Sequence, residues 1–144
     1  MCQEIFNVIT GRHSVRAYLD KPVPDELLEK IVSVAIQCPS WGNSQPWEIA
    51  VVGGPVLDHI KKAYSKAMEE GRQPNPDFSF PASWPEENQK RYFENGQRMY
   101  KTLGIERADD RTREEFRKSG ASFFGAPQVV FLFLDEGLSQ WGLF

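Results

Sequence analysis

The sequence predicts a fold of the α+β class, and two observations support this. Apolar residues recur at helical spacing in several segments, each bounded by proline or glycine. Two short apolar runs, at 47–52 and 129–134, are instead typical of strands. With 144 residues, the chain also has the length of one ordinary domain, so we expect residues 1–144 to form a single domain.

The elements expected in the first half are set by apolar spacing and by proline and glycine. A first helix is predicted to end at Gly11. A second is predicted to begin after Pro24, with acidic residues at its positively polarised start, and to stop before Pro39. A strand should cover 47–52, and a third helix should follow Pro55.

The second half begins with an irregular loop. Residues 72–85 contain four prolines and three aromatic residues, which favours a packed covering loop over a flexible tether. Charged helices are expected over 86–103 and 111–124. The unbroken apolar run at 129–134 predicts a strand covered on both faces, and residues 138–144 have the pattern of a helix beginning.

Composition argues against several classes of protein. A net charge of −3 is unlike that of a general nucleic-acid binder. No apolar run approaches the roughly 20 residues of a membrane helix, and no secretory signal is visible, so we expect no membrane partner. The two cysteines have neither metal-ligand spacing nor a disulfide pattern. We therefore expect a cytoplasmic protein without a bound metal.

A basic cluster follows the first predicted helix. The sequence RHSVR places a hydroxyl, Ser14, between two cations, Arg12 and Arg16. Guanidinium forks and hydroxyls together are well suited to binding a phosphate group. The alternative interpretation is that both arginines are ordinary surface charges after a helix.

The segment from Cys38 to Trp47, CPSWGNSQPW, is unusual for a connector because it contains two tryptophans among small polar residues. That mixture suggests a wall that packs against a flat group with polar edges. Alternatively, the tryptophans are core residues, and Asn43 and Gln45 satisfy their own turn. With the basic cluster, the segment suggests a site for a planar, phosphorylated cofactor. No nucleophile with its base and no phosphate-binding glycine loop is visible, so we assign no catalytic residue.

Together the two clusters resemble a motif pair of the FMN-dependent nitroreductase family. That family shows R-x-S-x-R, then a helix ending in A-P-S, then N-x-Q-P-W leading into a strand. RHSVR, CPS and NSQPW match this order and spacing over residues 1–54. GAPQVVFLFLDEG and LSQWGLF resemble the family's central strand and the start of its long dimer helix, and the charged helices resemble the nitrobenzoate-reductase-like branch.

The resemblance implies a homodimer of α+β subunits, each a three-layer α/β/α structure with a mixed central sheet, with FMN at the interface. Because family members are longer, it also implies a chain that is incomplete at its carboxy terminus. It carries two groups of site residues onto this sequence. The first would hold the FMN phosphate: Arg12, Ser14 and Arg16 by side chain, His13 and Val15 by backbone. The second, from the other subunit, would cover the isoalloxazine ring: Pro39, Ser40, Trp41, Asn43 and Gln45.

The function implied is transfer of reducing equivalents from NAD(P)H through FMN to a small acceptor such as a nitroaromatic or a quinone. We expect the loop containing Phe78, Phe80 and Trp84 to help cover the substrate pocket. Two alternatives remain open. The chain is a non-enzymatic fragment or remnant with half a flavin site, or it is a flavin-dependent dehalogenase-like relative on the same fold.

Overall fold

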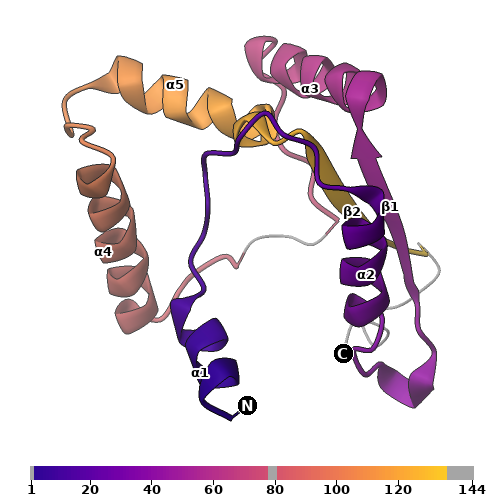
Figure 1. Ribbon diagram of the computed structural model, residues 1–144. Helices are drawn as coiled ribbons and strands as arrows, with labels where there is room; N and C mark the ends of the chain where they lie inside the picture. Colours follow the sequence, from indigo (N-terminus) through magenta and orange to yellow (C-terminus); the bar gives the residue numbers. More distant parts are fainter. Residues whose placement is uncertain (1, 78–80, 136–144) are drawn as a thin grey trace. The chain divides into compact units, whose positions relative to one another are not determined.

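The computed structural model describes residues 2–77 and 81–135 (Figure 1). The described elements are, in chain order, α1 (Cys2–Gly11), α2 (Asp25–Ala35), the 3₁₀ turn η1 (Trp41–Asn43), β1 (Trp47–Gly53), α3 (Gly54–Glu69), α4 (Glu86–Thr102), α5 (Asp110–Ala121), the 3₁₀ turn η2 (Phe123–Gly125) and β2 (Gln128–Leu134). The α+β class is thereby confirmed. The helix beginning expected at 138–144, and Phe78 and Phe80 of the covering loop, lie outside the described residues.

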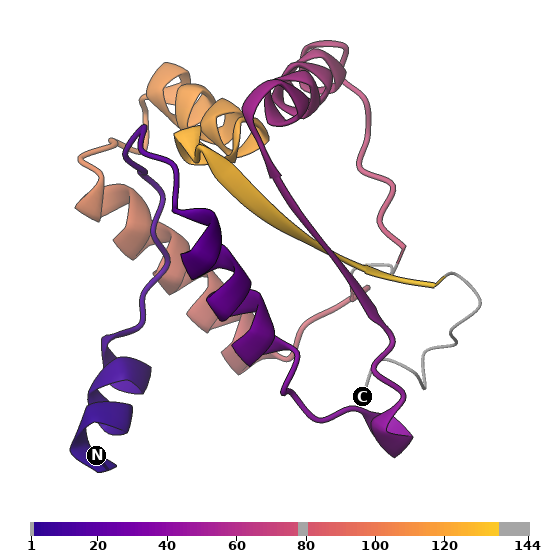
Figure 2. The same ribbon diagram turned by 45° about the vertical axis from the view of Figure 1, so that its right-hand side comes forward.

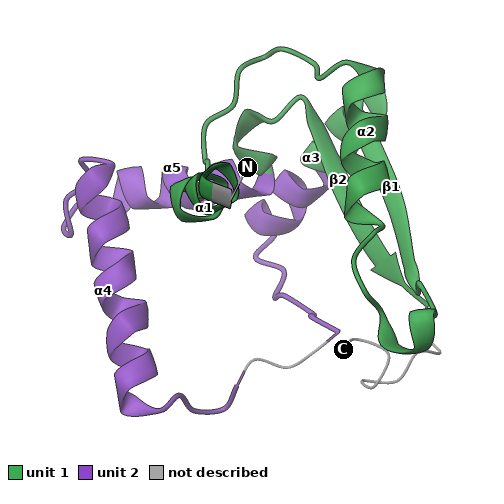
Figure 3. Cartoon of the chain, turned by 60° about the horizontal axis from the view of Figure 1, so that its bottom comes forward, with its two compact units in different colours: residues 1–62, 122–144 green, residues 63–121 purple. Residues whose placement is uncertain are grey.

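The chain divides into two compact units (Figure 3). Unit 1 comprises residues 1–62 and 122–144, and unit 2 comprises residues 63–121. Unit 1 therefore contains both strands, α1, α2 and the first part of α3, whereas unit 2 contains α4 and α5. None of the described helices combines the length and apolar character needed to cross a membrane.

The sheet of unit 1 is an antiparallel pair in which Trp47 lies opposite Leu134 and Gly53 lies opposite Gln128 (Figure 2). Partners in such a pair share a face, and alternate residues point to the same side. One face is consequently apolar over three of its four residue pairs, formed by Trp47, Ile49, Val51, Val130, Leu132 and Leu134, and ends in the pair of Gly53 and the polar Gln128.

Helix α2 runs alongside this strand pair (Figure 2). Residues of the helix and of the sheet line a groove between them. Leu28 and Val32 of the helix, with Ile36 directly after it, line the groove, whereas the sheet contributes residues at the Gly53–Gln128 end. Farther along the same face, Leu132 is 71% exposed. The prediction that this strand is covered on both faces is therefore wrong for the described chain, because α2 lines only one end of the pair.

Two helices end earlier than the sequence predicts, α2 before the expected stop at Pro39 and α5 before residue 124. Helix α2 ends at Ala35 because the next turns tighten, with the Gln37 N–H donating to Val34 O at 3.1 Å and the Cys38 N–H to Ala35 O at 3.1 Å. Helix α5 ends at Ala121 because Phe123 and Phe124 both have a φ of 54°, which an α-helix cannot accommodate.

The start of β2 is fixed by α3 within unit 1. Leu57 of α3 is only 1% exposed, and Ala126 is buried. Nearby, Lys61 Nζ donates a 2.7 Å hydrogen bond to the Ala126 carbonyl. Along the strand, Phe131 makes an edge contact with Phe123, their ring centroids 5.8 Å apart. These contacts connect the loop before β2 to the sheet and to α3.

Unit 2 is organised by contacts between α4 and α5. The ring of Tyr100 on α4 meets the ring of Phe116 on α5 edge to face at 6.1 Å. The guanidinium carbon of Arg113 lies 5.0 Å from the Tyr100 ring centroid, a cation–π distance. Arg113 also donates to the Arg107 carbonyl at 3.3 Å. These local contacts join the two helices through the short 103–109 connection.

Asp109 caps the start of α5 through a hydrogen bond to the Thr112 backbone. Its Oδ1 accepts the Thr112 N–H at 3.0 Å. Hydrogen bonds from the Thr112 side chain, and then from its backbone, hold the pKa of Asp109 below 3.8. A carboxyl group whose pKa is lowered on folding stabilises the folded state above its unfolded pKa and stops doing so as the pH falls through its folded value. We expect stability to decline below about pH 4.

The Asp109→Asn variant is expected to flatten this decline because asparagine caps without titrating. Urea unfolding at pH 7 and pH 3, followed by circular dichroism, measures the change. Asp109→Ala should lower stability at pH 7, since the cap is lost. Glu114, whose pKa is lowered by its hydrogen bond to Arg117, stays in all three proteins and so cancels in the comparison. A decline in Asp109→Asn as steep as in the parent would contradict the assignment.

Candidate cofactor site

The basic cluster lies in a stretch without regular secondary structure, directly after α1. The Arg12 N–H donates to Ile9 O at 3.4 Å and so closes the last helical turn. His13 Nδ1 lies 3.0 Å from the Gly11 carbonyl, and the Tyr18 hydroxyl donates to the Val15 carbonyl at 3.3 Å. All residues from 11 to 20 are exposed, so the cluster is accessible to a ligand.

The arginines of this cluster can bind a phosphate because they have no ion-pair partner among the described residues. Within the part of the chain that the structure describes, neither Arg12 nor Arg16 forms an ion pair. The arginines of α5 behave differently, since Arg111 pairs with Glu115 at 3.0 Å and Arg117 pairs with Glu114 at 2.7 Å. Two guanidinium groups without a carboxylate partner, on either side of the Ser14 hydroxyl, can donate several charge-assisted hydrogen bonds to one anion.

The second cluster is a turn with an uncommon backbone. Gly42, Asn43 and Gln45 have φ values of 58°, 55° and 47°, in the left-handed region. Such a conformation is unfavourable for residues with a side chain and is found repeatedly at ligand sites. The turn is held by hydrogen bonds: the Gln45 N–H donates to Ser40 Oγ at 2.9 Å, and Gln45 Nε2 donates to Asn43 Oδ1 at 3.2 Å.

These hydrogen bonds support the interpretation that Asn43 and Gln45 satisfy polar groups of their own turn. The side chain of Trp41, in contrast, is exposed. Trp41 is 77% exposed, so the alternative that it is a core residue is wrong for the described chain. Trp47, the first residue of β1, is half-buried. Pro39 is exposed as well. The turn therefore presents an indole that is accessible to a flat ligand.

The structure does not bring the two clusters together within one chain. Among the described residues, no hydrogen bond or ion pair joins the 12–16 segment to the 39–45 turn. The roles given to Arg12, His13, Ser14, Val15 and Arg16, and to the turn residues, remain predictions.

Sequence reasoning missed Gln128, which makes a long-range contact with the segment that carries the basic cluster. Its Oε1 accepts the Val23 N–H at 2.6 Å, and its Nε2 donates to the Val23 carbonyl at 3.2 Å. The available signal was a single polar residue opening an apolar strand directly after Pro127. Nothing in the local pattern indicates its partner.

Comparison with known proteins identifies the family. The sequence profile of the nitroreductase family matches residues 9–141. The chain belongs to the nitroreductase family. The resemblance based on the two motifs is therefore confirmed.

Two curated members of the nitroreductase family illustrate the relationship. Nitroreductase NfnB of Mycolicibacterium smegmatis is 32% identical over 134 residues, which are 92% of this chain and 57% of the relative. A 4-nitrobenzoate reductase of Nocardioides sp. is 31% identical over 129 residues, 83% of this chain and 50% of the relative. The chain thus spans little more than half the length of these relatives.

A solved structure supports the nitroreductase fold. The crystal structure of the FMN-dependent nitroreductase NfnB from Mycobacterium smegmatis in complex with NADPH matches this chain with a TM-score of 0.88 at 31% identity. The match covers 96% of this chain and 62% of that chain. The nitroreductase-like fold predicted from the sequence is confirmed.

Proposed function

We propose that this nitroreductase-family chain is an FMN-dependent oxidoreductase that passes reducing equivalents from NAD(P)H to nitroaromatic or quinone-like acceptors. The observation that carries the proposal is the exposed Arg12–Ser14–Arg16 cluster, whose guanidinium groups have no carboxylate partner among the described residues. The family match and its relatives, two of which are named as nitroreductase and 4-nitrobenzoate reductase, support the same chemistry.

In this proposal the protein binds and orients, and the flavin, when bound, supplies the redox chemistry. Arg12 and Arg16 donate guanidinium hydrogen bonds to the phosphate, and Ser14 donates its hydroxyl. His13 and Val15 contribute through their backbone. No side chain of this chain is assigned as acid, base or nucleophile.

The turn at 39–45 provides the wall for the ring. Its hydrogen bonds, with Ser40 Oγ accepting from the Gln45 N–H, hold the left-handed backbone in one conformation before any ligand arrives. A preformed wall lowers the ordering cost of binding. Trp41 offers an exposed indole face, and we propose that Pro39 and Asn43 line the same wall.

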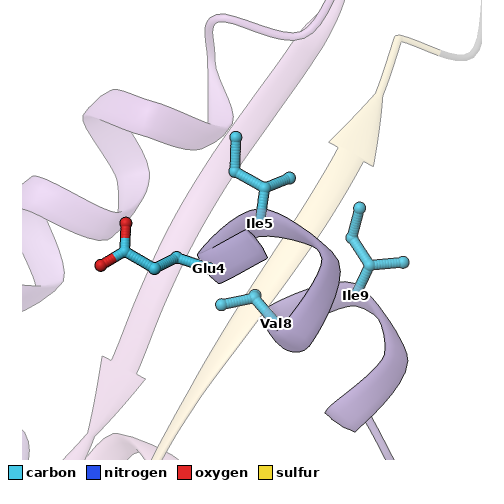
Figure 4. A pocket seen from close by; sticks show the side chains of 4 residues that line it. All are labelled: Glu4, Ile5, Val8 and Ile9. Atoms are coloured by element: carbon cyan, nitrogen blue, oxygen red, sulfur yellow. The ribbon is translucent and has the colours of Figure 1, made fainter. Parts of the chain in front are cut away.

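We propose a homodimer in which residues 1–144 of each subunit form one FMN-binding domain, the phosphate cluster and the ring wall of one site coming from different subunits. The support is α1, on which Ile5, Val8 and Ile9 lie exposed beside Glu4 (Figure 4). Val8 is 75% exposed. Adjacent exposed apolar side chains mark interaction surfaces more often than isolated ones do.

Replacing Val8 and Ile9 by glutamate is therefore expected to weaken the dimer at least about 100-fold, since each buried aliphatic side chain contributes about 1.5–3 kcal/mol. Sedimentation velocity over a concentration series measures the change. Val34→Glu on α2 is the control, because Val34 is an exposed aliphatic residue on another helix. A parent protein that stays monomeric throughout would overturn the dimer.

An anaerobic redox titration tests the activity. NADPH or NADH is added to the FMN-loaded protein, and the flavin absorbance is expected to bleach and then return when 4-nitrobenzoate or a quinone is added. FMN without protein is the control. Bound flavin that neither reductant bleaches would favour the non-enzymatic alternative. Return of colour only with halogenated phenols would favour the dehalogenase-like alternative.

A further inference from the structure

The side chain of Gln128 forms a two-point contact with the backbone of Val23, from which it is separated by 105 residues of sequence. The amide oxygen accepts the Val23 N–H at 2.6 Å, and the amide nitrogen donates to the Val23 carbonyl at 3.2 Å. Both bonds are partly buried. A primary amide that binds both polar groups of one residue imitates a neighbouring strand and so fixes that residue's direction as well as its place.

Val23 is well suited to such a contact because prolines stand on both sides of it. Pro22 and Pro24 lack a backbone N–H and have restricted φ angles, so within 22–24 only Val23 can donate. Pro24 then caps α2, with a φ of −57° and a ψ of 142°. Holding Val23 therefore holds the point at which the irregular 12–24 segment enters a helix.

The other side of the contact belongs to the sheet. Gln128 is the first residue of β2 and lies opposite Gly53 in the sheet register. Two residues before it, the Ala126 carbonyl accepts the 2.7 Å hydrogen bond from Lys61. The space at Gly53 is also filled, because a Cβ there would lie 3.0 Å from Gln128 Cγ and 3.3 Å from the Pro127 carbonyl oxygen. Gln128 thus extends from a fixed end of the sheet.

The segment held in this way carries the basic cluster. Between Gly11, where α1 ends, and Pro24 the chain has no regular secondary structure, and residues 11–20 are exposed. An irregular segment loses conformational entropy when a ligand orders it, and a tether at its end lowers that cost. A tether at Val23 therefore lowers the ordering cost of the segment without contacting a ligand itself.

We infer that Gln128 is a positioning residue for the cofactor phosphate, which it serves by anchoring the carboxy-terminal end of the segment that carries Arg12, Ser14 and Arg16. The inference rests on the proposed function. It predicts that losing the Gln128 amide weakens binding of flavins that carry a phosphate and spares those that lack it.

The test compares FMN with riboflavin, which has the same ring system without the phosphate. Gln128→Met keeps the length of the side chain and removes both hydrogen bonds. Two neutral hydrogen bonds correspond to a rise of about tenfold in the FMN Kd. The riboflavin Kd is expected to stay unchanged. Both are measured by quenching of flavin fluorescence, with the circular dichroism spectrum confirming the fold. Gln73→Met is the matched control, because Gln73 also donates to a backbone carbonyl, that of Gly71, at 3.3 Å.

Gly53→Ala provides a second perturbation that leaves Gln128 in the sequence. The added Cβ would lie 3.0 Å from Gln128 Cγ, so the Gln128 side chain must give by a few tenths of an ångström, and a selective loss of FMN affinity smaller than that of Gln128→Met is expected. Gly96→Ala is its control, since a Cβ at Gly96 meets no atom within 4 Å. If Gln128→Met does not fold, the FMN and riboflavin Kd values of Gly53→Ala test the inference instead.

Each outcome has one meaning. A selective rise in the FMN Kd supports the inference. Equal rises for FMN and riboflavin, or no rise for either, overturn it, because the contact is then structural or irrelevant. A parent protein that binds FMN no better than riboflavin overturns the phosphate site itself and so the proposed function.

Discussion

Replacing Arg12 and Arg16 together by alanine is expected to raise the FMN Kd at least about 100-fold while leaving riboflavin binding unchanged. Hydrogen bonds between charged groups contribute about 1.5–3 kcal/mol each, and each 1.4 kcal/mol is about tenfold in Kd. Neither arginine has an ion-pair partner among the described residues, so the loss is not offset by the release of an internal carboxylate. Fluorescence titration at constant ionic strength measures it, because salt screens exposed charges.

The control variant also loses two arginines, but from positions outside the basic cluster. Arg91 and Arg98 lie exposed on α4 in unit 2, and their double alanine variant should bind FMN as the parent does. Lysine at positions 12 and 16 keeps the charge but loses the guanidinium fork, so we expect intermediate affinity. If the control variant loses as much affinity as the double variant at 12 and 16, net charge rather than the cluster binds the phosphate.

Leu57→Ala is expected to have the largest effect on stability, lowering the free energy of unfolding by about 2–5 kcal/mol. Leu57 is 1% exposed, and unlike most apolar residues of the described chain its side chain is fully enclosed. Truncating it removes buried apolar surface and leaves a cavity in unit 1. Urea unfolding followed by circular dichroism measures the change.

Val56→Ala serves as the neighbouring control. Val56 is exposed on the same helix, and alanine is the better helix former, so we expect a change within about 0.5 kcal/mol. Equal losses at positions 56 and 57 would contradict the assignment of Leu57 to the core of unit 1. Both substitutions lie in one turn of α3, so the two variants differ in the burial of the side chain rather than in its place in the helix.

The fold was predictable where the determinants are local. The first residue of α2 follows from Pro24 and the acidic residues after it, and β1 follows from an apolar run closed by two glycines. The end of α5 was not predictable, because Phe123 and Phe124 extend an aromatic pattern while their backbone leaves the helical region. A side-chain pattern reports periodicity, not the sign of φ.

In the candidate site, too, the features with local determinants were predictable from the sequence and the others were not. RHSVR and CPSWGNSQPW are each a continuous stretch of sequence, so the residue types within each stretch indicated its chemistry. The exposure of Trp41 and the hydrogen bond from the Gln45 N–H to Ser40 Oγ required coordinates. The contact between Gln128 and Val23 could be found only from the coordinates. A single sequence has no signal that relates positions 105 residues apart.

The division of unit 1 between two separate parts of the sequence has a consequence for how the protein is made. Residues 63–121 stand between the two strands in the chain, so β1 emerges from the ribosome long before β2. Contacts between α4 and α5 are local and form quickly, whereas the sheet must first close a long loop. We therefore expect strand pairing to limit the folding rate. Until β2 arrives, the backbone of β1 is an unpaired edge that another nascent chain can bind.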